Sequence, residues 1–415
     1  MLRADRRPIG AHFLQIPGPS PVPERILRAL SQPTIDHRGP DFAALGLKTL
    51  RGVREIFKTR QPVVIYSGSG TGAWEAARVN TMSAGDHLLM YETGHFASLW
   101  IKLARRLGLV PEVVEWAGED PLLPEAPGWR RGVSASLIED RLRRDRHHKI
   151  KAVCVVHNET STGVTSDIVA VRAAIDAAKH PALLMVDAIS SLASVDYRHD
   201  EWGVDVTISG SQKGLMMPPG LSFNVASARA LDAMNRAQLP RSYWAWDEII
   251  EMNQDGFWPS TPSTNLLFGL AESLDMILGE GLDNVFARHL RWAEAVRAAV
   301  RAWGADILCA DAECFSPVLT GVLAPPGIDA DAFRQAVLQN FDMSLGSGLG
   351  KLKGQVFRIG HLGNTNDLTL IAAIAGCEMG LKMAGANLSG CGVQTAMDYF
   401  ADHPAPGAVL GAHRA

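Results

Sequence analysis

The sequence predicts an α/β protein in which a mainly parallel sheet is sandwiched by helices and followed by a smaller α+β domain. The first observation is the alternation of short, continuously apolar runs, such as Val63–Tyr66 and Ala182–Val186, with amphipathic stretches. Strands that are apolar along their whole length are typical of parallel sheets covered on both faces. The second is a change of pattern near residue 270, where long helical stretches begin. The third is the length of 415 residues, which exceeds what one compact core usually holds.

The predicted elements alternate in the order that such a sheet requires. In the larger part we expect strands at 63–66, 87–91, 113–116, 151–156, 182–186 and 204–209, and helices at 73–80, 99–107, 136–144 and 168–178. In the smaller part we expect helices at 266–278, 285–303 and 330–340, and strands at 321–323 and 356–359. The resulting division is an N-terminal segment at 1–25, a large domain at 26–280, a small domain at 281–400 and a loose tail at 401–415.

The composition is that of a soluble globular protein and excludes several classes of partner. Apolar residues make up 47% of the chain, charged residues make up 20%, and the formal net charge is −4. So small a charge favours neither nucleic acid nor an anionic membrane as a partner, and no apolar run is long enough to span a bilayer. Five cysteines without a CxxC pair predict free thiols and no metal site. The basic start lacks the apolar segment of a secretion signal, so we expect a cytoplasmic protein.

The glycine-rich loop Ser67-Gly-Ser-Gly-Thr-Gly72 stands between a predicted strand and a predicted helix. Glycines let the backbone turn sharply and present successive N–H groups, and the helix start adds the positive end of its dipole, so the loop suits a phosphate. Gly68, Gly70 and Ala73 also fit the loose dinucleotide fingerprint, with Glu92 about twenty residues later. The loop alone therefore leaves open a nicotinamide cofactor and a purely structural tight turn.

Two further polar residues follow predicted strands. Asp187 comes directly after 182–186, at the sheet edge where α/β proteins bind ligands, although an acid there can also cap the next segment. Lys213 lies in a Gly/Ser/Pro loop, and no other charged residue stands between Asp205 and Arg229. A lone lysine is usually a solvated surface charge. Removal from water, however, lowers the pKa of a lysine amine and makes it nucleophilic, as Schiff-base chemistry requires.

Taken together, the three signals distinguish between cofactors better than any one of them does alone. Pyridoxal phosphate needs an anion site for its phosphate, a carboxylate for its pyridine nitrogen and an amine for its aldehyde. The 67–72 loop, Asp187 and Lys213 would supply all three at strand ends of one sheet. A nicotinamide cofactor would use the loop and leave the other two unexplained. The sequence has no G-x-S-x-G nucleophile elbow and no H-E-x-x-H zinc motif.

Six stretches, in one order along nearly the whole chain from Pro17 to about Leu362, carry a family pattern. They are Asp36-His-Arg-Gly-Pro-Asp41, Ser67-Gly-Ser-Gly-Thr-Gly72, His157-Asn-Glu-Thr-Ser-Thr-Gly163, Val186-Asp187, Gly210-Ser-Gln-Lys213 with Pro218-Pro-Gly220, and Val356-Phe-Arg-Ile-Gly360. With these stretches the chain resembles the class V, fold-type I pyridoxal-phosphate aminotransferases. It is most similar to their serine-glyoxylate and alanine-glyoxylate aminotransferase branch.

The resemblance implies a role for each matching residue. Lys213 would form the Schiff base with pyridoxal 5′-phosphate and carry the proton between substrate Cα and cofactor C4′, and Asp187 would pair with the pyridine nitrogen. Arg358 would clamp the substrate α-carboxylate, which its planar guanidinium suits. The other contacts that the resemblance implies are Ser69, Gly70, Thr71 and Gln212 for the phosphate, Phe96 for stacking on the cofactor ring, Thr160 for the phenolic oxygen side, and Gly18 for close backbone approach to the carboxylate.

The segment Phe257-Trp-Pro-Ser-Thr261 matches a loop that reaches the phosphate in the neighbouring subunit. The resemblance therefore implies a homodimer with shared active sites. Trp258 stands where relatives usually carry Tyr, and an indole N–H can donate a hydrogen bond but cannot accept one. Thr261 is therefore the better candidate for the phosphate contact.

The resemblance implies an aminotransferase that moves the amino group of a small amino acid to glyoxylate, giving glycine and a 2-oxo acid. Serine is the favoured donor, with aspartate or alanine as alternatives, and Arg38 could meet a side-chain carboxylate. Another class V activity, cysteine desulfuration, would need a reactive cysteine such as Cys309, Cys314 or Cys391. The alternative from a different class is an NAD-dependent oxidoreductase that uses the 67–72 loop.

Overall fold

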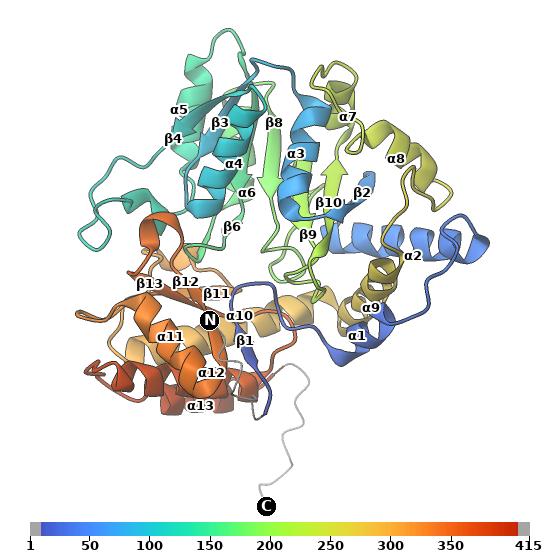
Figure 1. Cartoon of the computed structure of the whole chain (residues 1–415). Helices are drawn as coiled ribbons and strands as arrows, with labels where there is room; N and C mark the ends of the chain where they lie inside the picture. The colour runs from blue at the N-terminus through green and yellow to red at the C-terminus, as the bar shows by residue number, and fades with distance from the viewer. Residues whose placement is uncertain (1–9, 406–415) are drawn as a thin grey trace, which may run out of the picture.

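The computed structural model describes residues 10–405. This part of the chain forms a larger body around one sheet and a smaller body around a second sheet (Figure 1). The basic start of the chain and positions 406–415 of the predicted tail lie outside the described residues. Of the rest of the predicted tail, residues 401 and 402 form the end of a helix.

The larger sheet has seven strands over the described residues, and all but one run parallel, as predicted. In spatial order they are β2 (Val63–Gly68), β10 (Gly220–Ala226), β9 (Val206–Gly210), β8 (Leu183–Asp187), β5 (Ile150–Val156), β3 (His87–Tyr91) and β4 (Val110–Val114). Because β10 is antiparallel to both β2 and β9, β2 points the same way as β9. The carboxyl ends of the six parallel strands therefore meet at one edge of the sheet.

Helices flank this sheet (Figure 1). Those of the larger body are α1 (Glu24–Leu30), α2 (Pro40–Phe57), α3 (Gly70–Thr81), α4 (His95–Arg106), α5 (Ala135–Arg144), α6 (Ile168–Ala177), α7 (Ala228–Met234), α8 (Trp246–Asn253) and α9 (Thr264–Glu280), with the 3-10 turn η1 (Pro127–Arg130). Helix α3 packs on β9 and β10, whereas α4 packs on β3, β4 and β5. The starts of both helices therefore lie near the carboxyl edge of the sheet.

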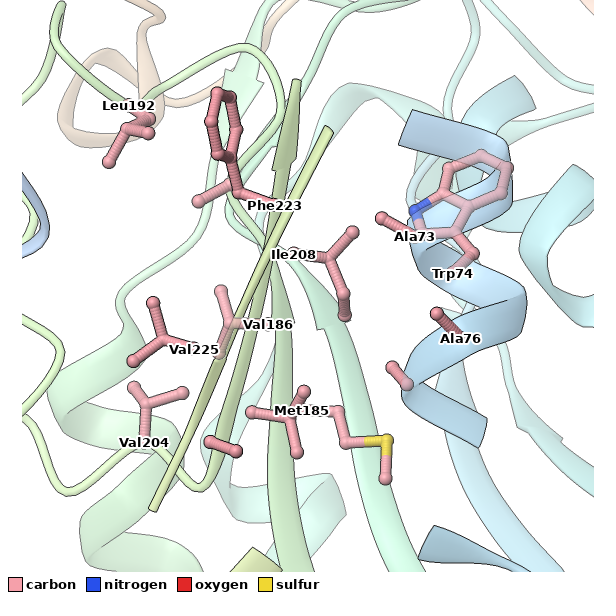
Figure 2. Close-up of a cluster of buried hydrophobic side chains, with 14 of the residues drawn as sticks. Ala73, Trp74, Ala76, Met185, Val186, Leu192, Val204, Ile208, Phe223 and Val225 are labelled. Carbon is pink, nitrogen blue, oxygen red and sulfur yellow. The ribbon is translucent and has the colours of Figure 1, made fainter. Parts of the chain in front are cut away.

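Burial explains why the central segments form strands. All residues of β8 and β9 are buried, which is the pattern of parallel strands covered on both faces. In Figure 2, Ile208 of β9 points toward α3, which closes this face of the sheet with the small side chains of Ala73 and Ala76, whereas Val186 of β8 points to the opposite face. Small residues on this helix face let α3 approach the sheet closely.

The smaller sheet has four strands over the described residues. In spatial order they are β1 (Phe13–Gln15), β12 (Met343–Ser347), β13 (Val356–Gly360) and β11 (Leu319–Leu323). Its helices are α10 (Leu282–Ala302), α11 (Ala330–Phe341), α12 (Asp367–Met383) and α13 (Gly392–Asp402), with the 3-10 turns η2 (Ala312–Cys314) and η3 (Gly350–Leu352). Strand β1 pairs with β12, so the N-terminal segment crosses into the smaller body.

A two-stranded ribbon and separate cores complete the arrangement. Strands β6 (Asn158–Glu159) and β7 (Val164–Thr165) form the ribbon, and Val164 also bridges to Phe315 of the smaller body. One cluster of buried apolar side chains spans Ile26 to Val285, and another spans Trp292 to Phe400. Each sheet therefore has a hydrophobic core of its own.

Residues 10–405 contain neither a membrane-spanning helix nor a cluster of metal-binding side chains. No helix in this range is both long and apolar enough to cross a lipid bilayer. The same range contains no group of three or more His, Cys, Asp or Glu side chains arranged to hold a metal ion. The five cysteines are free thiols.

Candidate active site

Lys213 follows β9 at the carboxyl edge of the larger sheet, and only 7% of its surface is exposed. Its Nζ donates a hydrogen bond to the carbonyl oxygen of Pro17 at 2.5 Å. Burial, together with the charge of Arg358, lowers the pKa of the amine from 10.5 to about 7, against the opposing effects of Asp187 and Glu159. Near neutral pH, a large fraction of this amine is therefore an uncharged nucleophile.

The N-terminal segment covers Lys213. Gly18 has a φ of +114°, and a Cβ atom there would lie only 2.7 Å from Lys213 Cε, so the lysine side chain occupies the space that any other residue would need. Ser20 donates its hydroxyl to the Lys213 carbonyl oxygen at 2.8 Å and its N–H to the Gln212 carbonyl oxygen at 3.0 Å. The backbone at Gly18 lies against the Lys213 side chain, while its approach to the substrate carboxylate stays a prediction.

Asp187 is the last residue of β8, and only 3% of its surface is exposed. Its Oδ1 accepts the N–H of Ile189 at 2.8 Å, and its Oδ2 accepts the indole N–H of Trp74 at 2.9 Å. Burial raises the pKa of this carboxyl to about 7, although both hydrogen bonds oppose the rise. A nearby cation would favour its ionised form.

Ser69, Gly70 and Thr71 form the N-terminus of α3, beside the carboxyl end of β2. Ser69 occupies the N-cap position, yet its side chain makes no capping hydrogen bond. A Cβ atom at Gly70 would lie 2.9 Å from Ile189 Cγ1, so a larger residue there would displace the Ile189 side chain. The helix start therefore offers N–H groups, a hydroxyl and the positive end of the helix dipole to an anion.

Gln212, next to Lys213, adds an unpaired polar atom. Its Oε1 is buried without a hydrogen-bond partner among the described residues. A buried unpaired polar atom is costly, and turning the amide over would present its NH2 group instead. This side chain therefore has hydrogen-bonding capacity left for a ligand.

Glu159 is a fully buried carboxylate at the end of β6. It accepts the N–H of Ala97 at 3.0 Å, the N–H of Phe96 at 3.4 Å and the hydroxyl of Ser161 at 2.6 Å. Gly94, the N-cap of α4, has no side chain to accept the free N–H groups at the start of that helix. Glu159, from a distant part of the sequence, accepts them instead. The half-buried Phe96 is thereby held in place.

Arg358 lies on β13 of the smaller sheet and reaches toward the larger body. Its Nε donates to the Ser347 carbonyl oxygen at 2.8 Å, and its Nη1 donates to the Thr160 carbonyl oxygen at 2.6 Å. Burial lowers the pKa of the guanidinium to about 10, although Glu159 opposes this. Two of the five guanidinium N–H groups are used in these bonds, which leaves the others for a carboxylate.

Two predicted residues are not brought into this group. Trp258 has 8% of its surface exposed, and its indole N–H donates to the Ile65 carbonyl oxygen at 2.9 Å. Its ring packs edge-on against Phe42. The only hydrogen that this indole can donate is thus used within its own chain. Thr261 is exposed on the loop before α9.

The sequence model of the family described as Aminotransferase class-V matches residues 13–306. This span contains the N-terminal segment, the 67–72 loop, Asp187 and Lys213. The chain belongs to the class-V aminotransferase family. It is therefore an aminotransferase, and its fold is the fold-type I architecture of pyridoxal-phosphate enzymes, as the sequence predicted.

Relatives of this class-V aminotransferase cover nearly the whole chain. A serine–glyoxylate aminotransferase from Arabidopsis thaliana is 43% identical over 95% of this chain and 96% of its own. One from Hyphomicrobium methylovorum is 44% identical over 93% and 94% of the two chains. An L-aspartate–glyoxylate aminotransferase from Paracoccus denitrificans is 43% identical over 93% and 95%.

A solved structure supports the fold. The ureidoglycine–glyoxylate aminotransferase of Bacillus subtilis superposes with a TM-score of 0.85 at 26% identity, covering 95% of this chain and 99% of that one. The backbone arrangement is therefore shared with a class-V enzyme along nearly its full length.

Class-V aminotransferases depend on pyridoxal 5′-phosphate, and so does this enzyme. The residues of the site fit that group. The α3 start with its uncapped Ser69 and the unpaired Gln212 amide suit a phosphate. Asp187 is a buried carboxylate to which no cation from the described part of the chain is bonded, as a pyridinium partner should be, and Lys213 is a buried amine of lowered pKa.

Two alternatives lose their support in this class-V aminotransferase. Glu92, the acidic residue that fits the dinucleotide fingerprint, accepts the indole N–H of Trp129 at 3.1 Å and pairs with Lys351 at 3.3 Å. For a desulfurase, burial raises the pKa of the Cys309 thiol to about 12 and also that of Cys314. Cys391, the exposed cysteine, begins α13 of the smaller body.

Sequence reasoning missed Trp74 and Glu159. Glu159 stands inside the quoted stretch His157–Gly163, but only its neighbour Thr160 was assigned a role. Trp74 lies four positions after Gly70, on the same face of the helix that the glycine loop begins. A helical projection from Gly70 could have found Trp74, whereas the partners of Glu159 depend on tertiary structure.

Proposed function

We propose that this class-V aminotransferase transfers the amino group of serine to glyoxylate, giving glycine and the 2-oxo acid of serine. The observation that carries the chemistry is the buried Lys213 amine, whose pKa responds to both Asp187 and Arg358. The mutual electrostatic effect means that the amine, the carboxylate and the guanidinium share one small, largely dry site.

The proposed roles are those that the family resemblance implies for the matching residues. Lys213 is the proton carrier and the cofactor's covalent partner, and Asp187 pairs with the pyridine nitrogen. Arg358 and the backbone at Gly18 receive the substrate carboxylate. The residues proposed for the remaining cofactor contacts are Ser69, Gly70, Thr71 and Gln212 at the phosphate, Phe96 on the ring face, and Thr160 beside the phenolic oxygen.

When bound, pyridoxal phosphate supplies an aldehyde that exchanges with amines and an electron-poor ring that accepts charge from the substrate Cα. The chain supplies the rest. Arg358 orients the substrate by its carboxylate, since a planar guanidinium can bind both oxygens at once. The neutral Lys213 amine would take the proton from the substrate Cα and hold it on Nζ until it is passed on. The N-terminal segment over Lys213 keeps water away from this proton.

The choice of serine rests on the relatives. Two relatives at 43% and 44% identity carry serine–glyoxylate in their names. Aspartate is the competing donor because an L-aspartate–glyoxylate enzyme is 43% identical. Aspartate brings a second carboxylate, for which Arg38 is the sequence candidate, and Arg38 is exposed on the loop before α2.

A donor–acceptor screen of the purified holoenzyme tests this proposal. Serine, aspartate and alanine are each paired with glyoxylate and with pyruvate, and kcat/KM is measured for every pair. The proposal expects serine with glyoxylate to exceed every other pair by about tenfold or more, equivalent to one well-made polar contact. A higher kcat/KM for aspartate would replace serine as the donor, and activity with pyruvate alone would exclude glyoxylate.

We further propose a cytoplasmic homodimer whose subunits share their active sites. The exposed Thr261 is the residue proposed to reach the neighbour's phosphate, whereas Trp258 already donates its N–H within its own chain. The proposed domains are 26–280 and 281–400, preceded by the segment 1–25. Light scattering coupled to size-exclusion chromatography measures the mass, and a monomer of 44.8 kDa with full activity would contradict the shared sites.

A further inference from the structure

Trp74 connects the start of α3 to the carboxylate of Asp187. Trp74 lies on α3, the helix whose N-terminus forms the proposed phosphate site, and only 2% of its surface is exposed. Its indole nitrogen is turned toward the strands of the sheet (Figure 2) and donates to Asp187 Oδ2 at 2.9 Å. The hydrogen bond therefore crosses from the helix to the end of β8.

The indole of Trp74 is held from behind by Trp100. The two rings stack with centroids 6.0 Å apart and planes 22° apart. Arg78 fixes Trp100 in turn, since its guanidinium lies 4.8 Å from the Trp100 ring centroid and its Nη1 donates to the Trp100 carbonyl oxygen at 2.7 Å. The indole N–H of Trp100, unlike that of Trp74, has no hydrogen-bond partner within residues 10–405. A packed wall thus keeps the Trp74 donor aimed at Asp187.

Asp187 has few charged neighbours. The groups that face it are the Lys213 amine after β9, the Glu159 carboxylate on β6 and the hydroxyl of Tyr197, whose pKa the Asp187 charge helps to raise. From α3, the neutral indole N–H of Trp74 contacts the carboxylate. A hydrogen bond to an ionised carboxylate is stronger than one to its neutral form.

We propose that Trp74 is a positioning residue that keeps the Asp187 carboxylate ionised and directed at the pyridine nitrogen of the cofactor. The proposal rests on the role proposed above for Asp187. Helix α3 then positions the contacts at both ends of the cofactor, because its N-terminus receives the phosphate and the indole of Trp74 orients the Asp187 carboxylate. A single rigid element sets the distance between the two contacts.

The test compares two tryptophan variants. Trp74→Phe removes the N–H and keeps an aromatic ring, whereas Trp100→Phe makes the same change at a stacked neighbour whose N–H is unpaired. Full-length apoenzyme of each is titrated with pyridoxal 5′-phosphate between pH 6 and pH 9, and the dissociation constant is followed by tryptophan fluorescence and cofactor absorbance. The two variants lose the same atoms, so their difference isolates the hydrogen bond to Asp187.

We expect Trp74→Phe to weaken cofactor binding about tenfold near pH 7, the order expected for a hydrogen bond to a charged group, and Trp100→Phe to change it by less than about threefold. Because the Trp74 bond lowers the pKa of Asp187, its loss raises that pKa, and the defect should shrink as the pH rises toward 9. Equal losses in both variants, or a loss that does not change with pH, would overturn the proposal.

A second measurement serves if Trp74→Phe fails to fold. In wild-type apoenzyme labelled with ¹⁵N-tryptophan, one of the ten indole N–H resonances should follow the titration of Asp187 and cease to do so in Asp187→Asn. The absence of such a resonance would contradict the contact. If the role proposed for Asp187 is itself wrong, the result is different. In that case Asp187→Asn leaves the cofactor affinity unchanged.

Discussion

The amine nitrogen of Lys213 donates its hydrogen bond to the carbonyl oxygen of Pro17, 2.5 Å away. This contact joins the loop after β9 to the segment that follows β1, a strand of the smaller sheet. The proposed catalytic amine is therefore enclosed by parts of both bodies. Residue changes at either side of the contact should alter catalysis.

Lys213→Ala should lower transamination by about a thousandfold or more, because it removes both the covalent partner of the cofactor and the proton carrier. The visible absorbance of the lysine-bound cofactor should vanish with it. Activity is assayed by glycine formation, and circular dichroism verifies that the variant is folded. Normal turnover by a folded Lys213→Ala enzyme would exclude the assignment.

Gly18→Ala should impair the enzyme for two reasons. The residue has a φ of +114°, which costs an L-residue about 1–2 kcal/mol, and the new Cβ would collide with the Lys213 side chain. Gly85→Ala is the matched control, because Gly85 has a φ of +84° and nothing within 4 Å of its Cβ position. We expect both variants to lose unfolding free energy but only Gly18→Ala to show a large fall in kcat. Equal kcat values for the two variants would rule out the close approach.

Arg358→Lys should chiefly raise KM, by about tenfold or more, for donor and acceptor alike. The lysine keeps the positive charge but cannot bind both carboxylate oxygens in a planar fork. Arg334→Lys is the control, since Arg334 contributes to the electrostatics of Arg358 yet bonds to Leu345 and Asp331 of the smaller body. Steady-state kinetics with each substrate decide the matter, and an unchanged KM in Arg358→Lys would place the carboxylate elsewhere.

The buried amine also predicts how the stability of the apoenzyme varies with pH. Folding lowers the pKa of Lys213 from 10.5 to about 7, so the unfolded chain binds more protons than the folded one between these values. The stability contributed by this group therefore rises as the pH increases from 7 to 10.5, and below pH 7 the buried charge is destabilising. Lys213→Met should remove that dependence.

Thermal unfolding of the two apoenzymes measures this effect. The Tm of Lys213→Met should exceed that of wild type at pH 7, and the difference should shrink toward pH 10. Lys102→Met, at an exposed position on α4, should show no such trend. A constant difference between Lys213→Met and wild type across the range would mean that the amine is not titrating near neutrality.

The sequence alone was sufficient to predict much of the larger sheet, because the strands of that sheet are continuously apolar. The strand predicted at 87–91 is β3, and the helix predicted at 168–178 is α6 within one residue. Strand β10 was not predicted. It begins at Gly220 after two prolines, and it carries Asn224, whose amide donates to the Ala73 carbonyl oxygen at 3.2 Å. A buried polar partner from a helix cannot be read from local periodicity.

Helices α12 and α13 were also missed. Helix α12 is apolar on most of its faces because it packs against α10, α11 and α13, so it lacks the single stripe that marks an amphipathic helix.

For the site, Lys213 and Asp187 stood out because they follow buried strands. Trp74 and Glu159 did not, since their importance comes from partners far away in the sequence.

The most direct test of the central claim is the fate of the amino nitrogen. Holoenzyme is incubated with ¹⁵N-labelled serine and unlabelled glyoxylate, and the glycine formed is analysed by mass spectrometry. Direct transfer through the site around Lys213 predicts glycine that carries ¹⁵N in wild type and none in Lys213→Ala. Unlabelled glycine from wild type, or labelled glycine from Lys213→Ala at the wild-type rate, would contradict the account.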